Sequence, residues 1–124
     1  MRRIVIAFLI SLVAGPAFSL DDSELSLLGG YFYYQDLCPL VAAEANSLDP
    51  RDVFSILQSK YMKDNESSDR VKKQIFGTMM ALGKISGLYT KDKGTEKAVK
   101  FCQENRERTL KVASYALEWA NKNR

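Results

Sequence analysis

The sequence contains no histidine. Histidine is the commonest general base and metal ligand, and it is the side chain that titrates near neutral pH. The chain also lacks a Cys-x-x-Cys pair, a glycine-rich phosphate loop and a Gly-x-Ser-x-Gly nucleophile motif. We therefore expect no enzymatic activity, no metal site and no cofactor. Catalysis by paired carboxylates is the alternative, but acids such as Asp49, Asp52, Asp64 and Glu66 lie where helix caps and solvated turns use them.

A strong excess of charge of one sign is also missing. The 124 residues include 18 basic and 15 acidic side chains, and two of the basic ones are Arg2 and Arg3 in the N-terminal segment. The rest of the chain carries 16 basic and 15 acidic residues, a net charge of +1. Proteins that bind nucleic acids or anionic membranes display a basic excess or a basic stripe. We expect neither kind of partner here.

The chain has one long apolar run, at its N-terminus, and this run is too short to cross a membrane. It extends over about ten residues, Ile4 to Val13, whereas a transmembrane helix needs roughly 20. The basic pair before it and the small residues Ala17 and Ser19 after it are typical of a secretory signal peptide. We predict a signal peptide over residues 1–19, cleaved after Ser19. The alternative is an uncleaved membrane anchor.

Cysteine is scarce, since the chain contains two, Cys38 and Cys102. Disulfides form outside the reducing cytoplasm, so in an exported chain this pair predicts one disulfide; the alternative is two free structural thiols. The bond would close a loop of about 65 residues and contribute roughly 4 kcal/mol of stability. We expect residues 20–124 to form a single helical domain, periplasmic or secreted, in a bacterium and without stable membrane insertion.

Strand signals are almost absent, and apolar residues recur instead at intervals of three and four. The predicted fold class is all-α, a small helical bundle of four to five helices. Asp49 and Pro50 suit the N-cap and first position of a helix, and Thr95 also suits a cap. The polar interval Gln103 to Arg108 allows one long last helix or a break near Asn105, and we favour the break. The expected segments are 20–28, 34–45 with Pro39 starting, kinking or breaking it, 50–62, 68–89 capped by Ser67 or Ser68, and 96–120.

Glycines raise two further expectations. Gly29-Gly30 is expected to interrupt the first helix, because glycine is unfavourable in helix interiors. The 68–89 segment has the best amphipathic pattern but contains Gly77, Gly83 and Gly87. Because glycine lets another helix approach closely, we expect this segment to lie at the centre of the bundle.

Two segments are candidate partner contacts. The run Tyr31-Phe32-Tyr33-Tyr34 places four consecutive rings on the chain, and one face of a helix cannot hold all four. We expect one or two to be exposed, with Tyr31, Tyr33 and Tyr34 as candidate contacts because tyrosine is favoured at interfaces. Ordinary packing in the core is the alternative. The charged turn Lys91-Asp92-Lys93-Gly94 adds Lys91 and Lys93 as candidates.

The layout of the chain also resembles a known scaffold. Cys38 lies on an early apolar segment, Gly83 to Tyr89 lies in a middle helix, and Phe101-Cys102 precedes the amphipathic stretch Leu110 to Leu117. With the signal peptide, this order resembles the HdeA-like periplasmic fold. Two groups with that scaffold are the HdeA-type acid-activated chaperones and the Rap/Tai immunity proteins, which inhibit peptidoglycan amidases delivered by type VI secretion. The resemblance implies a helical scaffold and a protein partner.

These observations favour a non-catalytic periplasmic binding protein, of the inhibitor or immunity type, that docks on a secreted cell-wall hydrolase. One alternative is an acid-stress chaperone for unfolded periplasmic proteins. Protonation of all 15 carboxylates would raise the net charge from about +1 to +16, and the resulting repulsion would loosen the bundle. A second alternative is an accessory component of an envelope or secretion system.

Overall fold

The computed structural model describes residues 20–124, so the predicted signal peptide lies outside the described residues. Residues 20–124 form six α-helices and one short 3-10 helix and contain no strand, which confirms the all-α prediction. The count exceeds the expected four to five because the chain breaks at both Cys38 and Asn105. The helices are α3 (Asp22–Leu37), α4 (Pro39–Ala45), α5 (Pro50–Tyr61), α6 (Asn65–Ser86), η3 (Thr90–Asp92), α7 (Glu96–Glu104) and α8 (Arg106–Asn123).

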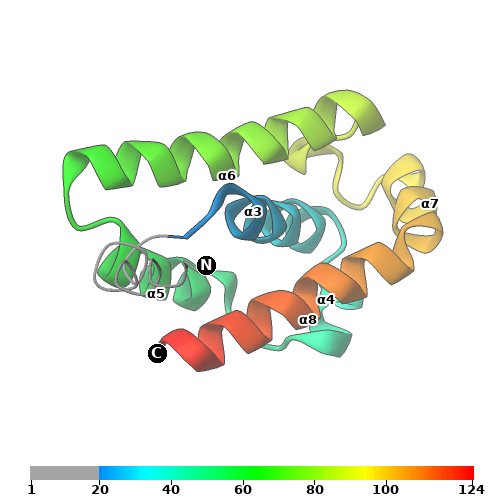
Figure 1. Ribbon diagram of the computed structural model, residues 1–124. Coiled ribbons are helices and arrows are strands. Elements are labelled where there is room, and N and C mark those ends of the chain that lie inside the picture. The colour runs from blue at the N-terminus through cyan, green and yellow to red at the C-terminus, as the bar shows by residue number, and fades with distance from the viewer. Residues whose placement is uncertain (1–19) are drawn as a thin grey trace, which may run out of the picture.

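Helix α3 lies at the centre of the bundle, between α6 on one side and α8 on the other (Figure 1). Helix α4 packs against α3 and α8, and α5 contacts α6 and α8. A helix surrounded in this way buries apolar residues around its whole circumference. The buried side chains of α3 are those of Leu25, Leu28, Tyr31, Tyr33, Tyr34 and Leu37. The expectation that the 68–89 segment is central is therefore wrong, because α6 covers one side of α3 and leaves its own outer face exposed.

Gly29 and Gly30 continue α3 rather than interrupting it. A Cβ atom built on Gly29 would lie 2.9 Å from the Thr78 Cβ and 3.0 Å from the Ile75 carbonyl oxygen. The backbones of α3 and α6 therefore meet closely at Gly29, and the packing gained there offsets a helix-propensity cost of up to about 1 kcal/mol. The close helix approach that the sequence suggested is real, but it uses a glycine of α3. Gly77 of α6 has no neighbouring atom within 4 Å of such a Cβ position.

Two predicted helix starts are confirmed. The Asp49 carboxylate accepts a hydrogen bond of 2.9 Å from the Arg51 amide, and Pro50 occupies the first position of α5. The Thr95 hydroxyl accepts a hydrogen bond of 3.2 Å from the Ala98 amide at the start of α7. These side chains satisfy amides that have no partner within the helix.

Helix α6 begins earlier and ends earlier than expected. Its N-cap is Asp64, which accepts a hydrogen bond of 2.8 Å from the Ser67 amide, so Ser67 and Ser68 lie inside the first turns rather than capping them. Its C-cap is Gly87, whose φ of 76° is a left-handed conformation that glycine adopts without strain. The expected start at residue 68 is too late because the first helical turn of α6 is solvated and has no apolar face.

The structure decides between the alternatives at the two predicted helix breaks, Pro39 and Asn105. Pro39 is the first residue of α4, where its missing N–H costs no hydrogen bond, so of the three roles left open it takes that of a helix start. The break near Asn105 is confirmed, since α7 ends at Glu104 and α8 begins at Arg106. The Thr109 hydroxyl, buried in α8, donates a 2.9 Å hydrogen bond to the Asn105 carbonyl oxygen at this break.

Two adjacent glycine substitutions test the close crossing of α3 and α6. We expect Gly29→Ala to lower the free energy of unfolding by about 1–3 kcal/mol, because its Cβ would meet the backbone of α6. Gly30→Ala is the matched control: its Cβ would lie 3.5 Å from a Val112 methyl group, an ordinary contact, and alanine gains up to about 1 kcal/mol of helix propensity. Urea unfolding of both variants measures the difference. Equal stabilities would contradict this crossing geometry.

Candidate functional site

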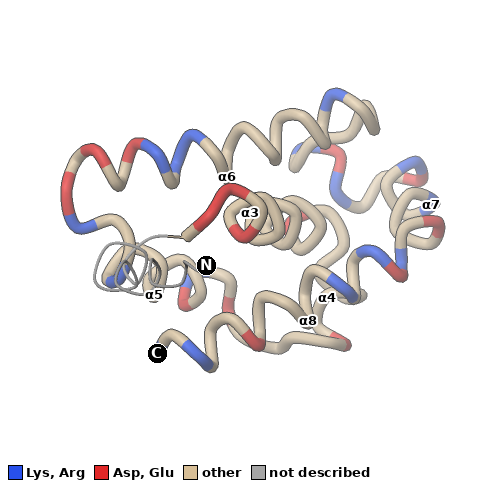
Figure 2. The backbone as a smooth tube through the Cα atoms, viewed as in Figure 1, with Lys and Arg blue, Asp and Glu red and all other residues tan. Residues whose placement is uncertain are grey.

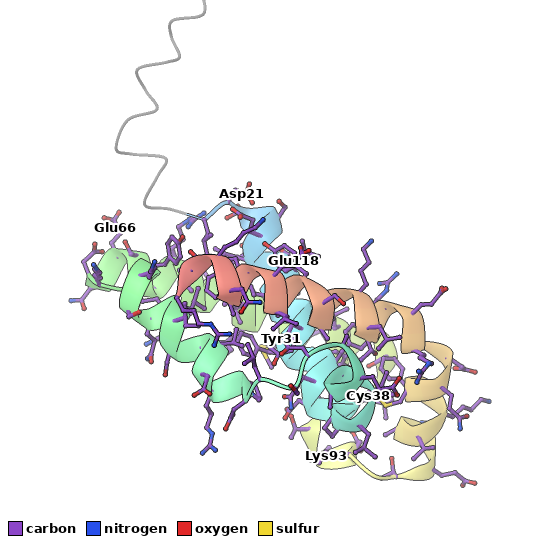
Figure 3. The ribbon with its side chains drawn as sticks, turned by 90° about the horizontal axis from the view of Figure 1, so that it is seen from below. Asp21, Tyr31, Cys38, Glu66, Lys93 and Glu118 are labelled. Atoms are coloured by element: carbon purple, nitrogen blue, oxygen red, sulfur yellow. A yellow bond between two sulfur atoms is a disulfide. The ribbon has the colours of Figure 1, made fainter. Side chains whose placement is uncertain are left out.

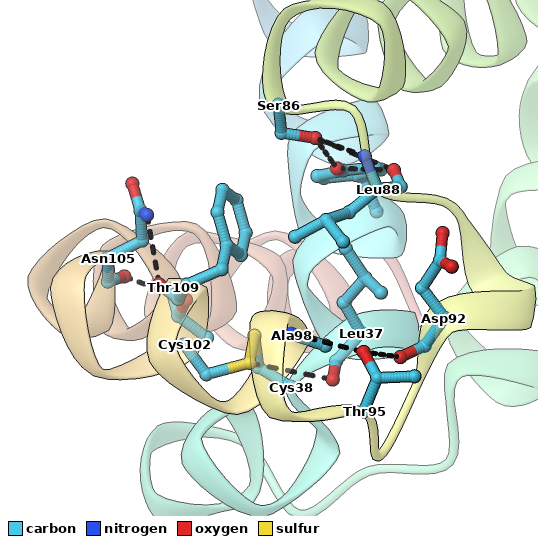
Figure 4. The surroundings of a disulfide bond; sticks show 12 residues. Leu37, Cys38, Ser86, Leu88, Asp92, Thr95, Ala98, Cys102, Asn105 and Thr109 are labelled. Carbon is cyan, nitrogen blue, oxygen red and sulfur yellow. Dashed lines mark hydrogen bonds between the residues drawn. A yellow bond between two sulfur atoms is a disulfide. The ribbon is translucent and has the colours of Figure 1, made fainter.

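The disulfide joins the start of α4 to α7. Cys38 and Cys102 are bonded, with their Cα atoms 5.7 Å apart, which confirms the predicted pairing over two free thiols. Cys38 is buried at the junction of α3 and α4, and Cys102 is part-buried. Figure 4 shows this bond between the α3–α4 junction, the last turn of α7 and the loop that precedes α7. The bond therefore fixes α7 against the centre of the bundle.

An apolar groove lies directly beside this disulfide. It has a volume of about 450 Å³, and its walls come from α4, α7, the first residue of α8 and the turn before α7. Both cysteines contribute to its lining. Its other lining residues are Leu37, Pro39, Leu40, Val41, Lys93, Gly94, Ala98, Val99, Gln103 and Arg106. The volume lies within the range of about 300–1,000 Å³ that is usual for ligand and anchor pockets.

Two exposed apolar side chains flank the groove. Leu40 is 85% exposed and Val99 is 49% exposed. Single exposed apolar residues are common on protein surfaces, but exposed apolar residues on both walls of an apolar concavity are typical of an interaction site. Burying them against a partner would contribute roughly 1.5–3 kcal/mol for each side chain.

The sequence predictions missed Leu40 and Val99, although a signal for both was present. Leu40 falls outside the helical stripe of Tyr34, Leu37, Cys38, Val41 and Ala45 that packs inward. Val99 similarly follows Ala98, which is the buried residue of α7. An apolar residue off the buried stripe of a helix is exposed unless a further element covers it.

The turn that carries Lys91 and Lys93 is held in place by hydrogen bonds at several points. The Asp92 carboxylate accepts a 2.8 Å hydrogen bond from the Tyr89 amide, and the Thr95 hydroxyl donates a 2.7 Å bond to the Asp92 carbonyl oxygen (Figure 4). The Thr90 hydroxyl donates to the Asp36 carboxylate of α3. Both lysines are exposed, as expected, and neither has an ion-pair partner among residues 20–124. Lys93 lines the groove.

The three candidate tyrosines are buried, so the expectation of one or two exposed rings is wrong. Tyr31 is 0% exposed, and Tyr33 and Tyr34 are each 4% exposed. The alternative, ordinary packing in the core, holds for these three tyrosines because the helices around α3 cover them. Phe32, the fourth ring, is only part-buried and lines a cavity between α3, α5 and α6. Figure 3 shows Tyr31 within the body of the bundle, whereas Cys38 and Lys93 lie together at one end.

Tyr33 and Tyr34 nevertheless contribute to the groove by positioning its walls. The Tyr33 hydroxyl donates to the Leu88 carbonyl oxygen at 2.9 Å and lies 2.6 Å from the Ser86 hydroxyl, which anchors the segment leading to the lysine turn. The Tyr34 ring stacks on Phe101 of α7, with centroids 5.8 Å apart and planes inclined by 5°. Tyr31 makes neither kind of contact, since its buried hydroxyl has no hydrogen-bond partner and burial raises its pKa to about 12.

The charges around the groove favour an acidic ligand. Residues 91–111 carry seven basic and four acidic side chains, whereas residues 20–90 carry seven basic and ten acidic ones. The groove lining itself contains Lys93 and Arg106 and no carboxylate. Arg106 donates a 2.9 Å hydrogen bond to Glu44 of α4, and this contact lowers the pKa of the Glu44 carboxyl. Lys93 is therefore the free cation of the groove.

Within residues 20–124, no group of three or more cysteine and carboxylate side chains is placed to hold a metal ion, and no helix is long and apolar enough to span a membrane. Comparisons with protein-family models, curated proteins and solved structures give no match to this chain.

Two conservative substitutions separate the roles of the buried tyrosines. We expect Tyr31→Phe to raise the free energy of unfolding by about 1 kcal/mol, because it removes a buried hydroxyl that has no partner. Tyr33→Phe should lower it by about 1–3 kcal/mol, because the Leu88 carbonyl oxygen and the Ser86 hydroxyl would each lose one hydrogen-bond partner. Thermal or urea unfolding of the two variants checks both signs. A loss of stability in Tyr31→Phe would contradict the assignment of an unpartnered hydroxyl.

Proposed function

We propose that this protein is a non-catalytic binding protein of the bacterial periplasm, of the inhibitor or immunity type, which docks on a secreted cell-wall enzyme through the groove beside its disulfide. The observation that carries the proposal is an apolar concavity with exposed Leu40 and Val99 on its walls and a free lysine, Lys93, at its rim. This arrangement fits a partner segment with one apolar anchor side chain beside acidic residues. Interfaces commonly concentrate their binding energy in such an anchor and its pocket.

The rigidity of the groove supports a role in binding. A disulfide, a stacked aromatic pair and a hydrogen-bonded turn fix its walls before any partner arrives. A preorganised surface avoids much of the entropy cost of ordering side chains and loops on association. The net positive charge of residues 91–111 would also steer an acidic partner toward this end of the molecule.

The choice of partner class rests on the chain's resemblance to the HdeA-like layout and on its predicted export. Both favour a protein partner in the cell envelope, and the immunity proteins that the layout resembles inhibit secreted amidases. The lack of a histidine and of a phosphate loop supports a non-catalytic role for the same surface. A binding protein needs only the shape and charge that the groove offers.

Substitutions of Leu40 and Lys93 test this docking surface. The purified protein is used to capture envelope proteins at neutral pH, and the dissociation constant of the captured enzyme is then measured with each variant. We expect Leu40→Lys to weaken binding at least about tenfold, since a buried anchor contact is worth more than about 1.4 kcal/mol. Lys93→Glu should slow association at low salt.

Ile85→Lys is the matched control, because Ile85 is 84% exposed, close to the 85% of Leu40, but does not line the groove. It should bind like the unsubstituted protein. Equal affinities for Leu40→Lys and Ile85→Lys would place the interface elsewhere and remove the basis of the proposal. The same conclusion would follow if the unsubstituted protein captured no envelope enzyme.

The acid-stress chaperone is the second candidate, and the placement of four carboxylates favours it. Asp21, Asp49 and Asp64 cap the first turns of α3, α5 and α6, and Glu44 joins α4 to Arg106 of α8. Hydrogen bonds from backbone amides and neighbouring side chains lower the pKa of each of these carboxyl groups. Acid would therefore remove several helix caps and the α4–α8 ion pair.

This arrangement predicts a loss of stability in acid. A carboxyl whose pKa is lower in the folded state contributes stability that is complete above its ordinary pKa and is lost as the pH falls through the folded value. The ordinary values are 3.8 for Asp and 4.5 for Glu, so the thermal midpoint should fall steadily below about pH 4.5. Glu44→Gln should show a smaller fall, because its carboxyl no longer titrates.

An aggregation assay at pH 3 with an unfolded client protein then separates the two candidates. Suppression of aggregation that appears together with the acid transition would favour the chaperone. A protein that loosens at pH 3 but suppresses no aggregation leaves the groove-docking proposal as the remaining one. A thermal midpoint that does not change between pH 6 and pH 3 would contradict the role assigned to the four carboxylates.

A further inference from the structure

The outer face of α6 exposes apolar side chains that no other part of residues 20–124 covers. Phe76 is 48% exposed and Met80 is 59% exposed, and these two residues lie one turn apart. Gly77 lies between them in sequence, and a Cβ atom built there would meet nothing within 4 Å. The face therefore combines two apolar projections with an open, shallow position beside them. Phe76 also lines a second cavity, of about 550 Å³, between α3, α5 and α6. The face shares no residue with the groove beside the disulfide.

Two charges on the same face, those of Asp69 and Lys84, lie at equal distances from the midpoint between Phe76 and Gly77. Successive residues of an α-helix are separated by about 100°, so Asp69, Lys73 and Lys84 fall on the same side of α6 as Phe76 and Met80. Asp69 lies seven residues before Phe76, and Lys84 lies seven residues after Gly77. Both are exposed, and neither has an ion-pair partner among residues 20–124. Figure 2 shows acidic residues gathered in the first turns of α6, with basic residues further along it.

We propose that α6 pairs antiparallel with α6 of a second copy of this chain, with a two-fold axis between Phe76 and Gly77. In that register Phe76 of each copy lies beside Phe76 of the other, because a two-fold axis brings the same flank of both helices together. The same register sets Asp69 opposite Lys84 twice, once on each side of the axis. Met80 faces Lys73, whose aliphatic stem can cover an apolar side chain while its ammonium group stays in water.

A second copy fits this face better than an unrelated partner because the face is complementary to itself. A two-fold interface brings the same patch of both copies together, so each contact occurs twice. A face with an acid on one side of its centre and a base at equal distance on the other satisfies that symmetry. The apolar contribution is limited to two large side chains from each copy, so the interface is small and the dimer is expected to dissociate in the micromolar range.

Sedimentation equilibrium of the purified protein over a range of concentrations tests the proposal. We expect a monomer–dimer equilibrium that Met80→Lys weakens at least about tenfold, because it places a charge at the centre of the contact. The matched control is Ile85→Lys on the same helix. Ile85 is 84% exposed but lies nine residues from Phe76, which is two and a half turns and therefore the opposite side of α6. It should leave dimerisation unchanged.

A charge exchange tests the register separately. Asp69→Lys and Lys84→Asp should each weaken the dimer about five- to tenfold, since each variant replaces two attractive pairs by two repulsive ones. The double variant should return to within about twofold of the original affinity. Circular dichroism spectra that match the unsubstituted protein would show that each variant is folded.

Three results would overturn the proposal. The first is a protein that stays monomeric up to about 1 mM, which is beyond the range of specific weak association. The second is a dimer that Leu40→Lys disrupts and Met80→Lys does not, which would place the contact at the groove. The third is a charge exchange whose double variant stays as weak as the single ones, which would exclude this register. A protein that stays monomeric and binds a different protein through its α6 face would also overturn the proposal.

Discussion

The central position of α3 is the constraint on which the rest of this structure depends. Helices α4, α6 and α8 pack around it, and the contact with α6 is so close that only glycine fits at Gly29. Tyr31, Tyr33 and Tyr34 therefore become core residues, whereas Phe32 is only part-buried. Because α3 is enclosed, α6 and α8 are held apart on opposite sides of it, and each keeps one side exposed to solvent. The surfaces available for binding are therefore those of the outer helices.

The end of α3 determines the geometry of the candidate site. Leu37 and Cys38 lie where α3 gives way to α4, and the disulfide at Cys38 brings α7 to the same place. Tyr33 and Tyr34, one turn earlier, hold the segment before the lysine turn and the ring of Phe101. These two buried tyrosines thus hold the walls of the groove in place from the core of the bundle. A tyrosine that anchors a wall of a groove influences binding without touching the partner.

The two exposed apolar surfaces differ in ways that fit different tasks. The groove beside the disulfide is concave, cross-linked and bordered by an unpaired lysine, which suits an asymmetric partner with an acidic segment. The face of α6 carries Asp69 and Lys84 at equal distances from its centre, which suits a symmetric contact. The groove lies on α4 and α7 and the face on α6, so the two associations would use separate residues. A dimer through α6 would present two grooves, and a multivalent partner would bind such a dimer with higher avidity.

The amino-acid sequence by itself determined the helical class, the break at Asn105, the starts at Pro50 and Thr95, and the pairing of Cys38 with Cys102. Each of these follows from local backbone chemistry or from there being only two cysteines. The continuity of α3 through Gly29, the burial of Tyr31, Tyr33 and Tyr34, and the exposure of Leu40 and Val99 were decided by the tertiary structure. Whether an aromatic or apolar side chain is buried depends on which other helices pack against the helix that carries it. The periodicity of a single helix does not specify those neighbours.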